Sequence, residues 1–206
     1  MNFISLDIET IPGDIDNRVW TKFRDSHEHM DSHAGLYGEF GQIVCVGMTV
    51  LNEDFEVLEG REKAWVASSA AEERKMLNEI QPILDKAGLV LVGHAIKMFD
   101  IPFMAKRFIH YGLKLPSSLQ TAGKKPWDLI HVDTMELMKF GGFTPMSLDS
   151  ACLLLGLSSP KEGCCGEDVW DMFKRGELDN IAQYCLGDTR ASAGVARILY
   201  QLNAFN

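Results

Sequence analysis

The feature that most limits how this chain can fold is an apolar stretch near its start that carries two carboxylates. Residues 3–10 read Phe-Ile-Ser-Leu-Asp-Ile-Glu-Thr, which predicts a strand buried on both faces, as at the centre of an α/β sheet. Because side chains alternate along a strand, Asp7 and Glu9 would project from the same face, about 6 to 7 Å apart along the chain. Two like charges on one buried face repel each other unless a cation lies between them. The alternative is that the strand ends near Leu6 and that water solvates both acids.

Length and composition favour a globular chain with one domain over residues 1–206. The 206 residues are 46% hydrophobic and include only 7 prolines, enough for one sizeable core. No apolar run approaches the about 20 residues of a membrane span, and no basic region followed by an apolar one opens the chain, so we expect neither membrane contact nor export. The five cysteines form no C-x-x-C pair, and their odd number fits a reduced, cytoplasmic setting.

The net charge of −9 argues against a uniformly basic nucleic-acid-binding surface. The charge is unevenly distributed, however, because residues 93–127 carry a local net charge of +5. The basic residues of this segment are Lys97, Lys106, Arg107, Lys114, Lys124 and Lys125, against the single acid Asp100. Two interpretations remain open, a surface that follows phosphates or an ordinary solvated helix and loop.

Periodicity predicts further strands over residues 41–51, 55–59 and 89–93. The first three strands of the chain are close in sequence and are expected to pair antiparallel, whereas the wholly apolar 89–93 is expected to run parallel to the first strand. Between them, Ser69 and Glu72 form a capping box that begins a helix ending at Gly88.

Two other segments lack a clear regular pattern. Residues 14–40 read as an excursion that could overhang a site, and their three histidines, His27, His29 and His33, lack the second Cys or His cluster that a zinc site needs. Residues 112–127 are rich in Gly, Pro, Ser and Lys and predict a loop.

The second half of the chain is predicted to be helical. Asp100 precedes a helical pattern with Pro102 in its first turn, where it would serve as N-cap, a role compatible with a catalytic one. In the last predicted helix, Tyr184 and Asp188 are four residues apart and therefore lie on one face. Beyond residue 127 only helices are predicted, over residues 133–140, 147–155, 167–174 and 177–202.

Three segments together carry a resemblance to a known family. Asp7-Ile8-Glu9-Thr10, the segment from Gly93 through Asp100 to Phe103, and Tyr184-Cys185-Leu186-Gly187-Asp188 resemble, in order, the three exonuclease motifs of the DEDD superfamily. The tyrosine is typical of its DEDDy branch. Over nearly its whole length the chain is similar to stand-alone predicted 3′-5′ exonucleases related to the proofreading domains of family B DNA polymerases.

The resemblance implies a DnaQ-like, RNase H-like three-layer α/β fold. The expected central sheet is mixed, with antiparallel N-terminal strands plus parallel strands, and helices flank it. The C-terminal half is expected to be helical.

The resemblance also implies a mechanism that needs these residue types. Hydrolysis of a phosphodiester places charge on the attacking and leaving oxygens, which two divalent cations about 3.5 to 4 Å apart can stabilise, and Mg²⁺ or Mn²⁺ prefers carboxylate oxygens. By the resemblance Asp7 bridges both ions, Glu9 and Asp188 hold the ion that activates water, and Asp100 supports the second ion. Tyr184 would orient the water rather than deprotonate it, since its unperturbed pKa is about 10.

The expected substrate contacts lie beside these acids. One position departs from the family pattern, because Ala95 stands where family B proofreading domains usually carry an asparagine that helps to hold the strand. Alanine cannot form that hydrogen bond, although His94 or Lys97 could replace it. The residues expected to contact substrate are Thr10, His94, Lys97, Phe99 and Arg107.

Three functions follow from the sequence as alternatives. The first is a 3′-5′ exonuclease on single-stranded DNA, and the second is an RNA exonuclease of the same class, since no reader of the 2′-hydroxyl is evident. The third is a nucleic-acid-binding module with a vestigial site, against which the presence of all four carboxylates and the tyrosine argues. The sequence identifies no polymerase or repair partner.

Overall fold

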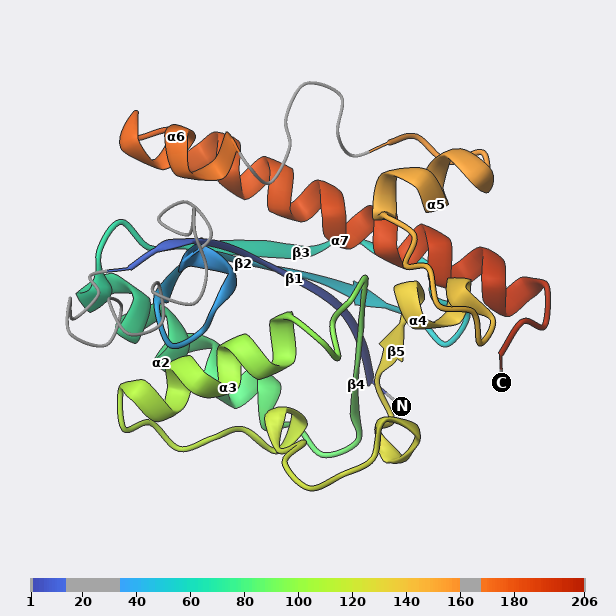
Figure 1. The fold of residues 1–206 in the computed structure, drawn as a ribbon, viewed down its shortest axis with the longest axis horizontal. Helices are drawn as coiled ribbons and strands as arrows, with labels where there is room; N and C mark the ends of the chain where they lie inside the picture. Colours follow the sequence, from blue (N-terminus) through green and yellow to red (C-terminus); the bar gives the residue numbers. More distant parts are fainter. Residues whose placement is uncertain (1, 14–33, 160–167, 206) are drawn as a thin grey trace.

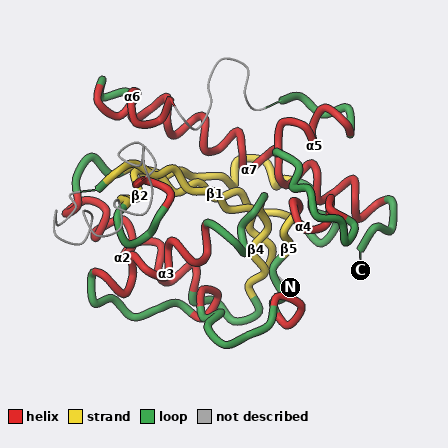
Figure 2. The backbone as a smooth tube through the Cα atoms, viewed as in Figure 1, coloured by secondary structure: helices red, strands yellow, loops and turns green. Residues whose placement is uncertain are grey.

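The computed structural model describes residues 2–13, 34–159 and 168–205, and these form a mixed five-stranded sheet between two layers of helices (Figures 1 and 2). The strands are β1 (Asn2–Pro12), β2 (Gly41–Leu51), β3 (Val57–Val66), β4 (Leu89–Gly93) and β5 (Val132–Asp133). Their order is β3-β2-β1-β4-β5. β1 pairs antiparallel with β2 and parallel with β4, which confirms the predicted fold and the central place of the first strand.

Helices cover both faces of this sheet. The helices are α2 (Ala70–Leu84), α3 (Asp100–His110), α4 (Thr134–Lys139), α5 (Leu148–Leu154), α6 (Val169–Lys174) and α7 (Leu178–Gln201), with short 3-10 turns η1 (Ala34–Leu36), η2 (Ser117–Leu119) and η3 (Pro126–Asp128). α2 and α3 lie below the sheet in Figure 1, and α7 crosses the opposite face. α5 and α6 pack against α7.

Alternation along β1 separates an apolar face from a polar one. Ile4, Leu6 and Ile8 are buried in the core beneath the sheet, together with side chains of α2 and α3. The intervening positions face α7, and Ser5, Asp7 and Glu9 are among them. The central strand therefore holds two carboxylates at the junction of the sheet with the last helix.

Hydrogen bonds and a close approach fix α7 on the sheet. Ser5 Oγ donates to the main-chain oxygen of Thr189 over 2.7 Å, and the hydroxyls of Thr49 and Thr189 are 2.7 Å apart. At Gly47 an added Cβ would lie 2.8 Å from Cys185 Sγ, too close for any side chain. The helix therefore has one close-fitting position over β1 and β2, and the residues on its inner face are fixed with it.

Several predicted boundaries differ from the structure. β3 continues to Val66 rather than ending at residue 59, because residues 60–66 form an exposed edge strand without an apolar alternation. The two-residue strand β5 was not predicted, and it lies where only helices were expected. The capping residue Ser69 was predicted correctly, since its side chain accepts a hydrogen bond from Glu72 in the first turn of α2. Ser147 caps α5 in the same way, which was not predicted.

Two further expectations concern the membrane and the cysteines. Within the ranges that the structure describes, no helix combines the length and the apolar character needed to cross a bilayer. Cys45, Cys152 and Cys185 are free, buried thiols. The histidines at 27, 29 and 33 lie outside the described residues.

Candidate active site

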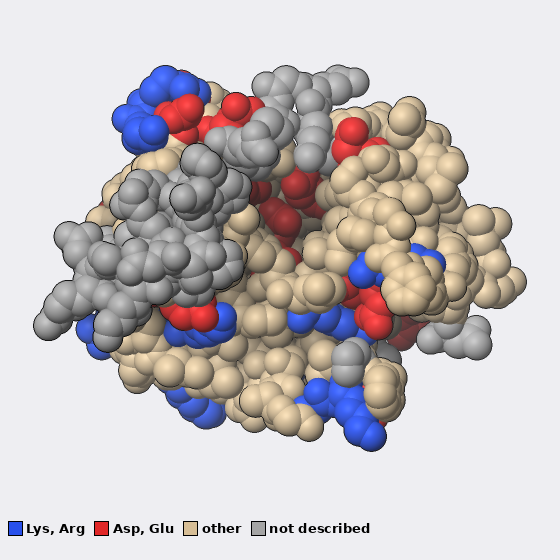
Figure 3. Space-filling model, viewed as in Figure 1, with Lys and Arg blue, Asp and Glu red and all other residues tan. Residues whose placement is uncertain are grey.

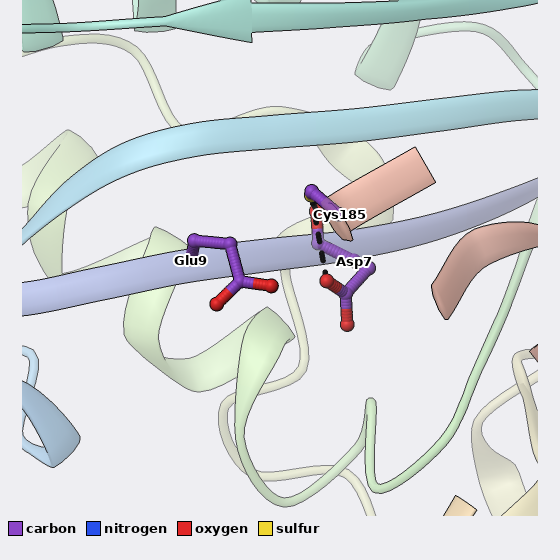
Figure 4. A group of neighbouring side chains, drawn as sticks. All are labelled: Asp7, Glu9 and Cys185. Carbon is purple, nitrogen blue, oxygen red and sulfur yellow. Dashed lines mark hydrogen bonds between the residues drawn. The ribbon is translucent and has the colours of Figure 1, made fainter. Parts of the chain in front are cut away.

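Asp7 and Glu9 project from the same face of β1, as the alternation predicted. Figure 4 shows both carboxylates beside Cys185 of α7, and one ligand atom from each of the three residues lies within 4.8 Å of the others. Because β1 continues to Pro12, the alternative of a strand that ends near Leu6 is excluded. Glu9 is only 7% exposed, so water does not solvate this carboxylate.

The Asp100 carboxylate reaches β1, beside Asp7 and Glu9, from the start of α3. It was predicted to cap its helix, but the structure contradicts this, since α3 begins at Asp100 and the N-cap position is Phe99. The Asp100 carboxylate instead accepts a hydrogen bond from the main-chain N–H of Ile8 over 3.1 Å. The N-terminus of α3 is thus joined to β1 between the two acids of that strand.

Four carboxylates, those of Asp7, Glu9, Asp100 and Asp188, influence one another electrostatically. Burial raises the pKa of Asp7 well above its ordinary value, and Glu9, Asp100 and Asp188 raise it further. The pKa of Glu9 is raised in the same way, by burial and then by Asp188. Burial raises the pKa of Asp100 to about 7, against hydrogen bonds from its own backbone and from Ile8 that lower it. The acids predicted from β1, α3 and α7 therefore form one repelling group.

This group suits divalent cations. The atoms that it offers as ligands are carboxylate oxygens, which Mg²⁺ and Mn²⁺ prefer. A bound cation would offset the mutual repulsion of the acids. Figure 3 shows acidic side chains at the bottom of a hollow in the middle of the displayed face. The chemistry of the group is therefore compatible with divalent cations.

The raised pKa values predict how pH and cations change stability. Between about pH 4 and pH 7 the folded protein keeps a proton on Asp100 that the unfolded chain has released, so stability without cations should fall as pH rises through this window. The raised pKa values of Asp7 and Glu9 act in the same direction. Mg²⁺ or Mn²⁺ should raise the melting temperature more at pH 8 than at pH 5, because protons compete for the oxygens at low pH. Melting curves with cation or with EDTA at both pH values test this, and an equal shift at both would contradict it.

Tyr184 lies on the inner side of α7, one turn before Asp188. It is half-buried and packs against the apolar cluster that contains Ile11 of β1 and Ile181 of α7. This cluster joins α7 to the sheet and to α6, and the Tyr184 ring packs against it. This places the tyrosine on the same helix–strand junction as the acids.

A carboxylate that the sequence did not single out holds the loop after β4. Asp133 accepts hydrogen bonds from the main-chain N–H groups of Ala95 and Lys97, both over 3.0 Å, and also caps α4. Ala95 has a positive φ of 63°, a conformation that asparagine tolerates better than alanine. Asp133 followed three residues later by Glu136 is a helix-start pattern that could have identified this residue.

The predicted substrate residues beside the acids are already held by protein contacts. Thr10 Oγ1 donates to the main-chain oxygen of Gly35 over 2.6 Å. His94 is bonded to Thr134 and to the main-chain oxygen of Met146. Lys97 pairs with Glu136 over 2.9 Å, and the half-buried Phe99 packs against Phe103. Their roles toward substrate stay predictions.

Arg107 does not belong with them, which corrects the prediction for this residue. It is 6% exposed, and its guanidinium makes two hydrogen bonds with Glu73, of 2.8 and 2.7 Å. Glu73 also accepts from Tyr111 and from the main-chain N–H of Ile43. The arginine is thus part of a buried network between α2, α3 and β2, and it cannot reach a phosphate on the surface.

Several basic residues of segment 93–127 are paired with acids from elsewhere in the chain. Besides Arg107, Lys106 pairs with Glu39, Lys114 with Asp85 and Lys97 with Glu136. The pairs of Lys106 and Lys114 are exposed and therefore weak. The interpretation as a phosphate-following surface is thus wrong for the buried Arg107 and stays a prediction for the lysines.

Replacing Arg107 with alanine should destabilise the protein and leave nucleic-acid binding by the folded molecules unchanged. Removing one partner of a buried ion pair leaves the other charge uncompensated, at a cost of about 3–5 kcal/mol. Urea unfolding measures the loss, and fluorescence anisotropy with a labelled oligonucleotide measures binding. Replacing Glu73 and Arg107 together by Gln and Met should recover part of the stability. If Arg107→Ala binds the oligonucleotide more weakly but is as stable as the wild type, Arg107 contacts substrate after all.

The fold thus has a mixed sheet with two acids on its central strand, and an acid and a tyrosine lie on the helix that crosses this sheet. The family described as "Predicted 3'-5' exonuclease related to the exonuclease domain of PolB" matches residues 36–191. The chain belongs to this family. The matched range contains Asp100, Tyr184 and Asp188, while β1 with its two acids precedes it. No curated protein matches the sequence.

Solved structures share this fold at low sequence identity. E. coli Exonuclease I in complex with a dT13 oligonucleotide aligns with a TM-score of 0.59 at 11% identity, over 96% of this chain and 40% of that chain. A family B DNA polymerase from Pyrobaculum calidifontis aligns with a TM-score of 0.61 at 17% identity, over 97% and 24%. Exonuclease I from Methylocaldum szegediense gives 0.60 at 10% identity, over 98% and 41%. The chain spans less than half the length of each of these proteins.

Proposed function

We propose that this chain acts as a single domain that removes nucleotides from the 3′ end of single-stranded DNA by metal-dependent hydrolysis. The observation that carries the proposal is that Asp7 and Glu9 of β1 lie together, with Asp100 of α3 bonded to β1 between them and Asp188 of α7 close enough to raise their pKa values. Membership of the exonuclease family supports the reaction. A reduced, cytoplasmic setting is supported by the free thiols among the described cysteines.

In this proposal the four acids hold cations and Tyr184 orients the attacking water. Asp7, Glu9, Asp100 and Asp188 would hold two ions of Mg²⁺ or Mn²⁺. When bound, the ions supply positive charge for the attacking and leaving oxygens. The Tyr184 hydroxyl would accept or donate a hydrogen bond that orients the attacking water, because a phenol with a pKa of about 10 is a weak base at neutral pH.

The residues beside the acids would bind the end of the strand. Phe99 offers a half-buried ring at the start of α3, and Thr10 directly follows Glu9 on β1. His94 and Lys97 lie on the loop that Asp133 holds, so their positions are fixed before substrate arrives. Binding to a fixed loop costs less ordering than binding to a free one, which favours a productive position of the 3′ end.

Single-stranded DNA is the substrate that the comparisons favour. The family is related to the exonuclease domain of PolB, and structures of E. coli Exonuclease I with this fold are complexes with dT13 or 5cy-dA13 oligonucleotides, one of them described as a complex with single-stranded DNA. These relations concern other proteins, so the substrate is proposed and not transferred. RNA is the alternative outcome of the test.

Digestion of matched DNA and RNA decides between the possibilities. Oligonucleotides of one sequence, labelled at the 5′ end, are incubated with the protein and Mg²⁺ or Mn²⁺. Stepwise shortening of DNA from the 3′ end supports the proposal, and faster shortening of RNA would make the protein an RNA exonuclease. Binding without shortening of either would indicate a vestigial site. A 3′-blocked oligonucleotide and the Asp7→Asn variant serve as controls.

A further inference from the structure

The thiol of Cys185 makes a direct contact with the central carboxylate of the site. Cys185 Sγ lies 3.4 Å from the main-chain oxygen of Asp7 and 3.4 Å from its Oδ2 (Figure 4). The cysteine is fully buried. It comes from α7, between Tyr184 and Asp188, so one turn of this helix carries three residues of the site.

The thiol is confined on its other side by the neighbouring strand. Gly47 of β2 is the register partner of Asp7. A Cβ at Gly47 would lie 2.8 Å from the sulfur, so the missing side chain of this glycine makes the space for the thiol. The sulfur is therefore held between Asp7 and Gly47 and has little freedom to move away from the carboxylate.

In this contact the Cys185 thiol acts as a hydrogen-bond donor to Asp7. Both partners of the sulfur on Asp7 are oxygen acceptors, so the thiol proton lies between them and can be given to either. A metal ligand would have to be a thiolate, which two oxygen acceptors at this distance would repel. The geometry thus favours a protonated thiol that acts on the carboxylate and not on the ion.

We propose that Cys185 is a positioning residue that holds the Asp7 carboxylate in the orientation needed for cation binding. Its donation to Oδ2 restricts the rotation of the carboxylate, so that Asp7 would present its oxygens to a cation in one orientation. Hydrogen bonds to ligating carboxylates orient them in this way in metal sites. This inference rests on the proposed function, because it assumes that Asp7 binds a cation.

Cation affinity without substrate tests the inference. Mn²⁺ binding is measured by electron paramagnetic resonance for the wild type and for Cys185→Ala, Cys185→Ser and Cys152→Ala. Cys185→Ala should bind Mn²⁺ about 10-fold more weakly, since loss of such an outer hydrogen bond has this order of effect. Cys185→Ser keeps a donor and should stay within about threefold of wild type.

The matched control is a buried cysteine at the far end of the same helix interface. Cys152 of α5 is also buried and packs with Val195 and Leu199 of α7, and of the four acids it lies near Asp188 rather than Asp7. Cys152→Ala removes the same atom from a core and should reduce thermal stability without changing Mn²⁺ affinity. If Cys152→Ala and Cys185→Ala weaken Mn²⁺ binding equally, Cys185 has a packing role alone and the inference is overturned.

Two other results would also overturn it. One is a Cys185→Ala variant that binds Mn²⁺ as the wild type does, and the other is a thiolate-to-metal absorption band when Cd²⁺ is added to the wild type, which would make Cys185 a ligand. If the wild type itself binds no Mn²⁺, the proposed function fails together with the inference. If the wild type binds Mn²⁺ and digests DNA while Cys185→Ala does both equally well, only the inference fails.

Discussion

Asp7→Asn is expected to abolish exonuclease activity and, at the same time, to raise the stability of the metal-free protein at pH 8. Activity is lost because the proposed bridging carboxylate is lost. Stability rises because the folded site holds Asp7 close to Glu9, Asp100 and Asp188, so the charge of Asp7 is unfavourable once it ionises. Turnover on end-labelled DNA and a melting curve in EDTA measure the two effects.

The control is Asp85, a carboxylate whose pKa the folded protein lowers instead of raising. Asp85 accepts hydrogen bonds from Ser117 and Lys114, which lower its pKa. Asp85→Asn should therefore leave turnover unchanged and reduce stability slightly. An Asp7→Asn variant that keeps its turnover would remove Asp7 from the catalytic residues, and a loss of stability in EDTA would contradict the repulsion among the four acids.

Tyr184→Phe is expected to lower turnover by about 10² to 10³, the effect of removing one hydrogen bond that acts chiefly in the transition state. Binding of Mn²⁺ and of single-stranded DNA should remain nearly unchanged. The ring stays in place, so its packing in the cluster with Ile11 is retained and stability should change little. Single-turnover kinetics separate the chemical step from binding.

Another tyrosine tests whether the effect comes from the site. Tyr111 donates its hydroxyl to Glu73 in the buried network of α2 and α3. Tyr111→Phe removes the same atom and should lower stability without lowering turnover. If Tyr184→Phe stays within about threefold of wild type, a change of under about 1 kcal/mol, the proposed role of the tyrosine is wrong and the carboxylates must be considered without it.

Local patterns predicted the parts of the structure that depend on neighbours in the sequence. Alternation along β1 gave Asp7 and Glu9 a common face, and the four-residue spacing gave Tyr184 and Asp188 a common face of α7. The apolar run 89–93 was long enough to be recognised as a parallel strand. These features need no knowledge of distant partners, because the period of the backbone alone determines them.

Contacts with distant partners were not predictable in this way. The positive charge of Arg107 was counted with its neighbours, whereas its partner Glu73 lies 34 residues away. Asp100 looked like a helix cap because its local sequence fits one, yet its acceptor role is toward Ile8, 92 residues earlier. Cys185 carried no local signal for a contact with Asp7, since a small apolar residue between two site residues usually serves packing.

The site also has a consequence for how the protein is made. Its two halves come from β1 and α7, and the contacts that join them, Ser5 with Thr189 and Asp7 with Cys185, span 184 and 178 residues. Contacts of such long range form late, because the intervening chain must be ordered first. During synthesis the acids of β1 leave the ribosome long before Asp188 does, so a nascent chain cannot assemble the proposed cation site. If the four acids hold the cations, the chain gains its activity only when its last helix docks.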